Sequence, residues 1–154
     1  MSRTVVSKTI AAPRAAVYRA FLDPEAVAAW LPPDSMTGVI HAFEPREGGA
    51  FRMSLVYPPD MAGRGKSSGN TDTFAARFAR LIPDTCVEWA VTFESADPAF
   101  AGEMMVRTTL EPAGAGTLIT MLCENIPSGI RPEDNETGCR STLEKLTAFV
   151  ERRP

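Results

Sequence analysis

The segment from residue 132 to residue 151 constrains the fold more than any other part of this 154-residue sequence. Apolar residues recur there at spacings of four, three and four, which is the periodicity of one helix face. The pattern predicts a long amphipathic helix whose apolar face must pack against another apolar surface. The stripe consists of Cys139, Leu143, Leu146 and Val150, widened by Phe149.

The surface for that helix to cover is predicted by seven segments with strand character. Most of these segments follow one another with only short connections, a pattern that favours an antiparallel sheet over repeated strand–helix–strand units. Two short helices are expected after the first strand, beginning at Ala12-Pro13 and Asp23-Pro24, because Pro is tolerated in the first helical turn and Asp can cap it. The predicted strands span 3–10, 39–43, 51–57, 72–81, 86–94, 103–111 and 117–125.

Composition excludes several classes of function. The net charge is −3 and the calculated pI is about 5.2, so a nucleic-acid binder, which needs a basic surface, is not expected. No run of about 18 apolar residues predicts a membrane-spanning helix, and no signal peptide is readable, so the expected location is the cytoplasm. The sequence predicts neither a metal nor an organic cofactor, because the three cysteines form no CxxC or Cys/His cluster.

Three stretches carry a resemblance to a known family. They are KTIAAPRAAVYRAFLDPEAVAAWLPP, REGGAFRMSL and ENIPSGIRPEDNETGCRSTLEKLTAFVE. Together they resemble bacterial single-domain relatives of the activator of heat-shock-protein-90 ATPase, within the SRPBCC (START-like, pollen-allergen-like) superfamily. The resemblance implies one α+β helix-grip domain over residues 1–154, with a curved seven-stranded antiparallel sheet around the C-terminal helix and two short helices after strand one.

The fold alone leaves several functions open, because one fold hosts many activities. The superfamily contains lipid and hormone carriers, polyketide cyclases and aromatases, and co-chaperone domains. The first expectation is binding of a small apolar or amphipathic molecule between the sheet and the C-terminal helix, with the 58–71 loop as a lid. A cyclase or aromatase using the same cavity and a chaperone-directed interaction module are the alternatives, and the protein is expected to be a monomer or homodimer.

Methionine and aromatic residues provide the candidate ligand-binding set. Met lines adaptable sites as well as filling irregular cores, so ordinary core packing is the competing interpretation. A polar residue in an apolar pocket would orient the ligand, and His41, Tyr57 or Arg107 could supply it. The apolar lining is expected from Trp30, Phe51, Met53, Phe74, Trp89, Met104, Met121, Cys139 and Leu143.

His41 is the only histidine and therefore the candidate catalytic base. Its spacing from Val39 and Phe43 predicts that all three share one strand face. A cavity-facing His41 with a hydrogen-bond partner would favour an enzyme, whereas a solvent-facing His41 would count against one. Strand carboxylates such as Glu88 are expected to face outward and to pair with arginines on neighbouring strands.

Overall fold

The computed structural model describes residues 2–33, 35–58 and 71–151. Within these residues the chain forms a seven-stranded sheet with two short helices after the first strand and one long helix at the C-terminal end. In chain order the elements are β1 (Arg3–Ile10), α1 (Arg14–Ala20), α2 (Pro24–Trp30), β2 (Thr37–Phe43), β3 (Ala50–Val56), β4 (Thr71–Ile82), β5 (Cys86–Phe93), η2 (Pro98–Phe100), β6 (Met104–Ala113), β7 (Gly116–Glu124) and α3 (Pro132–Glu151).

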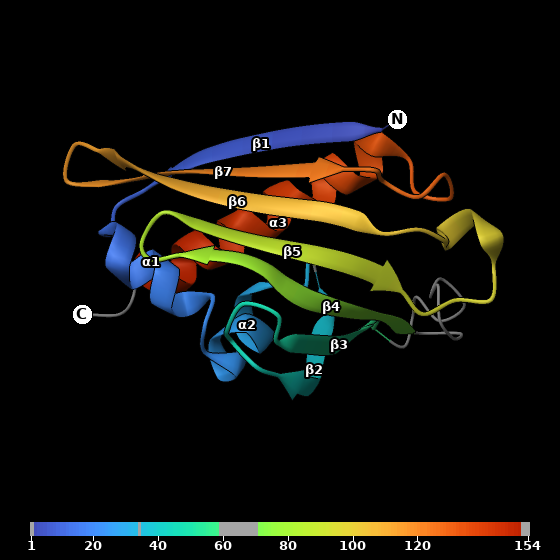
Figure 1. Cartoon of the computed structure of the whole chain (residues 1–154). Helices are drawn as coiled ribbons and strands as arrows, with labels where there is room; N and C mark the ends of the chain where they lie inside the picture. The colour runs from blue at the N-terminus through green and yellow to red at the C-terminus, as the bar shows by residue number, and fades with distance from the viewer. Residues whose placement is uncertain (1, 34, 59–70, 152–154) are drawn as a thin grey trace.

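The sheet is antiparallel throughout, in the order β1-β7-β6-β5-β4-β3-β2. Consecutive strands from β2 to β7 are neighbours, whereas β1 pairs with β7 and so joins the two ends of the sequence. The sheet lies in front of α3 in Figure 1, and α1 and α2 lie toward one end of that helix. The predicted α+β helix-grip architecture is therefore confirmed. The expected lid falls largely on residues 59–70, outside the described residues.

The two short helices begin where the Pro-containing dipeptides predict. Pro13 occupies the N-cap of α1 in an extended conformation. Asp23 caps α2 because its side chain accepts a hydrogen bond from the backbone N–H of Glu25, and Pro24 fills the first helical position. The indole of Trp30 then donates to the Ala20 carbonyl at 3.0 Å, which ties the end of α2 to the end of α1.

The long helix α3 has the predicted bounds and packs its apolar stripe inward. Leu143 and Leu146 are fully buried in the core that the sheet and helices share. Two polar side chains also connect α3 with the chain after α2. Thr142 donates to the Leu31 carbonyl at 2.9 Å, and Lys145 donates to the Pro32 carbonyl. These contacts fix α2 against α3.

The interior contains a connected group of aromatic rings. Phe51 lies at its centre, with ring centroids 5.3 Å from Trp89, 5.4 Å from Phe74 and 5.9 Å from Phe78. Phe51 and Phe78 are fully buried, and Trp89 is nearly so. Edge-to-face and stacked contacts at these separations are favourable, so the rings stabilise one another in the space beneath the sheet.

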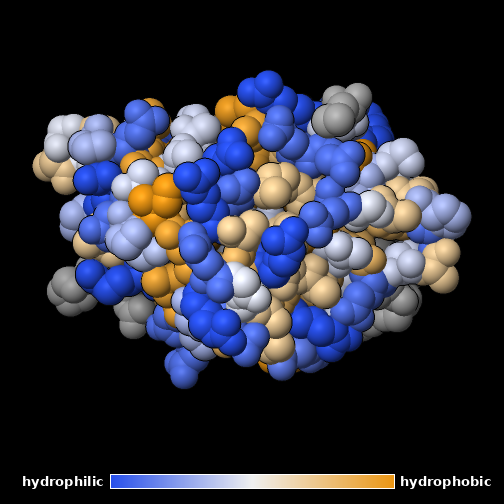
Figure 2. Space-filling view, viewed as in Figure 1, coloured by the Kyte–Doolittle hydropathy of each residue, from blue (hydrophilic) through white to orange (hydrophobic). Residues whose placement is uncertain are grey.

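The opposite face of the sheet carries ion pairs between strands and connections. Arg107 donates to Glu88 at 3.1 Å, across a pair of residues in register on β6 and β5. Figure 2 shows hydrophilic side chains spread over this face, with apolar side chains between them. The outward direction predicted for Glu88 agrees with this pairing, although its side chain is only 9% exposed and that of Arg107 is 41% exposed.

Candidate functional site

The expected apolar lining residues lie in the interior. All nine are buried, and most belong to the inward faces of β3, β4, β5, β6 and β7 or to α2 and α3. They pack within one continuous hydrophobic cluster. The structure thus brings together Trp30, Phe51, Met53, Phe74, Trp89, Met104, Met121, Cys139 and Leu143, as constituents of the core.

Trp89 contributes one unsatisfied polar group to this interior. Its indole Nε1 is buried and has no hydrogen-bond partner among the described residues. Phe21, the C-cap of α1, contacts both tryptophans, with ring centroids 5.8 Å from Trp89 and 4.6 Å from Trp30. A buried donor without an acceptor typically costs about 1–3 kcal/mol. The Trp89 ring is therefore well buried, but its N–H group lacks a hydrogen bond within the described residues.

The prediction that His41 shares a strand face with both Val39 and Phe43 is wrong. The register between β2 and β3 shifts between Ile40 and Ala42, so that one extra residue is inserted on β2. Such a bulge reverses the alternation of side chains. Phe43 consequently packs into the core, whereas Val39 and His41 are exposed.

His41 instead belongs to a polar chain of side chains on the outer strands. Its Nε2 is 2.7 Å from the Ser54 hydroxyl, which is 2.8 Å from the Thr73 hydroxyl. Because His41 is exposed, a base acting from this residue would face solvent rather than the interior. This placement counts against the cyclase or aromatase alternative.

The other two expected polar anchors already have protein partners. The Tyr57 hydroxyl donates to the Asp72 carboxylate at 2.9 Å, near the start of β4. Arg107 pairs with Glu88 on the face of the sheet opposite the aromatic interior. Neither arrangement places a charged group among the interior rings.

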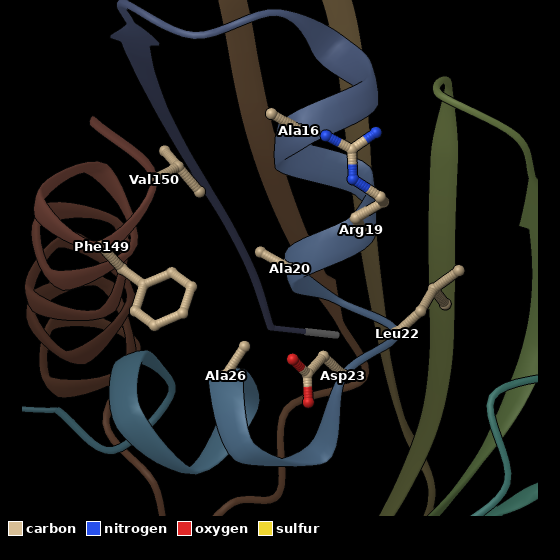
Figure 3. Close-up of a pocket in the computed structure, with 8 residues that line it drawn as sticks. All are labelled: Ala16, Arg19, Ala20, Leu22, Asp23, Ala26, Phe149 and Val150. Carbon is tan, nitrogen blue, oxygen red and sulfur yellow. The ribbon is translucent and has the colours of Figure 1, made fainter. Parts of the chain in front are cut away.

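A depression on the surface is formed instead by the three helices. We call it the helical cleft; it encloses about 480 Å³ between α1, α2 and the C-terminal end of α3. Figure 3 shows the Phe149 ring projecting from α3 toward the other two helices, with the methyl groups of Ala20 and Ala26 opposite it. The full lining is Ala16, Arg19, Ala20, Leu22, Asp23, Ala26, Phe149 and Val150.

Small side chains on α1 and α2 explain why the helical cleft is open. An alanine methyl leaves space at a helix contact that a larger side chain would occupy. Two hydrogen bonds nevertheless hold the elements around the cleft together. The Ala11 amide donates to the Glu151 carboxylate at 2.8 Å, and the Trp30 indole donates to the Ala20 carbonyl. Arg19 and Asp23 give this otherwise apolar depression a cation and an anion in its lining.

A second depression lies between β1 and α3. It encloses about 280 Å³ and has a more polar lining that includes Lys8, Arg140 and Glu144. Leu143 is the one expected ligand-binding residue in the lining of either depression. The described residues contain no group of three or more His, Cys, Asp and Glu side chains arranged to hold a metal ion. In the same part of the chain, no helix has the length and apolar character needed to span a membrane.

Sequence reasoning missed most of the helical cleft. The available signal was the alanine content of RAAVYRA and PEAVAAW, which form the two short helices. Alanine raises helix propensity as well as leaving space between helices, so its presence alone does not indicate a cleft. Phe149 was identified only as a residue that widens the apolar stripe of α3.

Comparison with known proteins identifies the family. The family model of the activator of Hsp90 ATPase homolog 1-like proteins matches residues 11–151. Protein CV1439 from Chromobacterium violaceum has a structure that superposes with a TM-score of 0.86 at 31% identity, with 97% of each chain covered. No curated protein matches this chain.

More distant solved structures share the fold. A Rhodobacter sphaeroides protein gives a TM-score of 0.78 at 20% identity, covering 99% of this chain and 94% of the other. An AHSA1-like protein from Aeromonas hydrophila gives 0.75 at 17% identity, covering 97% and 92% respectively. With the family match over residues 11–151, the chain belongs to the activator of Hsp90 ATPase homolog 1-like family, within the SRPBCC superfamily.

Proposed function

We propose that this protein binds a small, largely apolar molecule in the helical cleft. The apolar part of the molecule contacts Phe149 and the alanine methyl groups, while an anionic group on it meets Arg19. The fold of this superfamily commonly binds hydrophobic ligands, which supports the general class of function. The proposed site lies on the surface between the three helices, whereas the sequence predicted a site between the sheet and the C-terminal helix.

The observation that carries the proposal is the combination of volume and lining. A space of about 480 Å³ falls within the range of roughly 300–1,000 Å³ common for small-molecule sites. Its lining is mainly apolar, with Arg19 and Asp23 as the charged members. Such sites usually combine apolar walls with a few polar groups that orient the ligand.

The packing of the interior supports this choice of location. Trp30, Phe51 and Phe78 are fully buried and pack against other rings. A ligand beneath the sheet would have to displace side chains of this kind, and protein interiors resist such changes because they are closely packed. The helical cleft requires no comparable displacement.

Binding to the helical cleft is tested with dodecanoate as a defined probe. Trp30 is hydrogen-bonded to the carbonyl of Ala20, a cleft residue, so an occupant should change its fluorescence. Trp89→Phe removes the other tryptophan and leaves Trp30 as the sole reporter. The expected result is a saturable change in emission together with a one-to-one complex in native mass spectrometry.

Matched variants locate the binding site. Ala16→Leu fills part of the cleft and should weaken dodecanoate binding by about tenfold, equivalent to about 1.4 kcal/mol. Ala29→Leu makes the same change at an exposed position of α2 outside the lining and should leave binding unchanged. Arg19→Gln should weaken dodecanoate but spare dodecanol. Equal binding by the two leucine variants, or no binding by the wild type, would contradict the proposal.

A second candidate is stimulation of a chaperone ATPase through the protein surface. The family match and the densely packed aromatic interior favour it, because an interaction module needs no internal cavity. Under this candidate, the purified protein raises the ATPase rate of an Hsp90-type chaperone and co-elutes with it in size-exclusion chromatography. An unchanged rate with separate elution would contradict this function, independently of the dodecanoate result.

A further inference from the structure

Two buried cysteines from distant segments lie side by side in the core. Cys123 on β7 and Cys139 on α3 have their sulfur atoms 3.8 Å apart, although 16 positions separate them in the sequence. Both are free thiols in the structure. The third cysteine, Cys86, is also free and buried, but it lies on β5 and is paired in register with Thr109. Cys123 and Cys139 therefore form a pair, and Cys86 serves as a control within the same chain.

Polar groups around the pair distinguish the two sulfurs. Thr4 donates to the Asn135 side-chain oxygen at 2.6 Å, and the Cys139 thiol donates to the same oxygen at 3.9 Å. The contact between the two thiols lowers the pKa of Cys123, with smaller contributions from Thr4 and Asn135, while burial opposes the shift. The same contact with Cys123, together with burial, raises the pKa of Cys139.

This difference in pKa suits a nucleophile and its resolving partner. The thiolate is the reactive form of cysteine, so Cys123 is the sulfur better prepared to attack an oxidant. Cys139 keeps its proton and lies next to the attacking sulfur. For Cys86, by contrast, burial and the charge of Glu88 raise the pKa, which favours the unreactive thiol.

We propose that Cys123 and Cys139 are a peroxide-sensitive site that closes to a reversible disulfide between β7 and α3. The Cys123 thiolate attacks one oxygen of hydrogen peroxide, the O–O bond breaks, and the departing hydroxide takes a proton to leave as water. The Cys139 sulfur then attacks the sulfur of the resulting sulfenic acid; the S–O bond breaks, and the departing hydroxyl takes the thiol proton of Cys139 and leaves as a second water. The two thiols are oxidised and one peroxide is reduced to two waters.

The geometry requires only a local adjustment. A disulfide has an S–S distance of about 2.05 Å, so the sulfurs must approach by about 1.8 Å from their present 3.8 Å. Cys123 is 1% and Cys139 9% exposed, and neither lines the depression between β1 and α3, so hydrogen peroxide reaches the pair only when the packing beside that depression opens. That depression is lined by Arg140, the residue next to Cys139, and by Leu143, one helical turn further along α3.

Closing the bond would fasten α3 to the sheet. A covalent link across a loop of this length typically stabilises a protein by restricting its unfolded chain. For a domain of this size we expect the thermal midpoint to rise by about 5–10 °C. Because α3 carries Phe149 and Val150, the bond would also restrict the helix that forms one wall of the helical cleft.

The test exposes the full chain to a small excess of hydrogen peroxide under native conditions, followed by denaturation and alkylation with N-ethylmaleimide. Before alkylation, we expect a mass lower by two hydrogens than that of the untreated protein. After alkylation, we expect one modified cysteine, identified as Cys86, and a Cys123–Cys139 linked peptide that dithiothreitol separates. Cys86→Ser should form the same disulfide. Three alkylated cysteines after treatment, or a bond involving Cys86, would overturn the proposal.

A second measurement assigns the order of reaction. Cys139→Ser removes the resolving sulfur, so the sulfenic acid at Cys123 should persist and be trapped by dimedone. Cys123→Ser should show no labelling at Cys139. The mapping on the unsubstituted protein decides the proposal even if either serine variant fails to fold, and preferential labelling of Cys139 would overturn the assignment of Cys123 as the nucleophile.

Discussion

The space beneath the sheet and the helical cleft are both lined by apolar residues, yet one is closed and the other open. Beneath the sheet, large rings such as Phe51 and Phe78 are fully buried and contact one another. In the helical cleft, alanines from α1 and α2 face Phe149 across about 480 Å³. The difference lies in the size of the side chains where the elements meet, large rings beneath the sheet and alanines in the cleft.

Under the proposed function, this difference assigns stability to the interior and binding to the helical cleft. Rings that fill the interior contribute dispersion contacts and buried area, and they leave little space for an occupant. The alanines of the cleft contribute less buried area but preserve a space at a rigid junction. With the cleft as the proposed site, a member of this superfamily combines a filled interior with a binding surface elsewhere.

The largest expected effect is the loss of an interior ring. Phe51→Ala removes a fully buried side chain that contacts four other aromatic rings, and it should lower the free energy of unfolding by about 3–5 kcal/mol. Phe149→Ala changes the same residue type at a half-buried position in the cleft and should cost less than half as much. Urea denaturation measures both, and equal losses would show that the two regions do not differ.

An intermediate effect is expected at the junction that holds the cleft together. Thr142→Val removes the hydroxyl that donates from α3 to the Leu31 carbonyl, and should cost about 1–2 kcal/mol. Thr147→Val is the matched control, because its hydroxyl donates within α3 to Leu143. The control should change stability by less than about 0.5 kcal/mol, since a helix carbonyl already has a backbone donor.

The two threonine variants also affect the cleft differently. Thr142→Val should weaken dodecanoate binding as well as stability, because it loosens α2 against α3. Thr147→Val should leave binding unchanged. If both variants lower stability equally, the bond between α3 and Leu31 is not a specific support of the helical cleft.

The smallest effect is expected where Arg52 on β3 pairs with Glu94, the residue after the end of β5. The hydrogen bond from Arg52 lowers the pKa of Glu94. The pair therefore contributes stability above the ordinary carboxyl pKa of 4.5, and this contribution is lost as the pH falls below it. Because both side chains are well exposed, solvent screening should keep this contribution small.

A mutant cycle measures that contribution. Arg52→Gln should reduce the loss of stability on acidification, and Glu94→Gln should do the same. The double variant should add little to either, because each single change already removes the pair. Additive effects would indicate that the two residues act separately.

Local patterns in the sequence predicted most of the architecture. The bounds of α3 follow from the spacing of its apolar residues, and the start of α2 follows from Asp23 and Pro24. Both signals are contained within a few helical turns. The alternation of Val87 and Trp89 with Glu88 likewise predicted which side of β5 faces the core.

The candidate site was predicted less well, because it depends on contacts between segments. The apolar residues proposed to line a cavity all belong to the packed interior, and only Leu143 also lines one of the two described depressions. Whether apolar side chains fill or enclose a space depends on how several elements fit together. No periodicity along one element contains that information.

The sequence by itself determined the order of elements, the caps of the short helices and the inward face of α3, since these depend on residues close together in the chain. Tertiary structure decided the bulge that separates His41 from Phe43, the helical cleft and the contact between Cys123 and Cys139. Each of these depends on the register or packing of segments far apart in sequence. Small displacements between such segments change which side chains meet, and only the assembled fold fixes them.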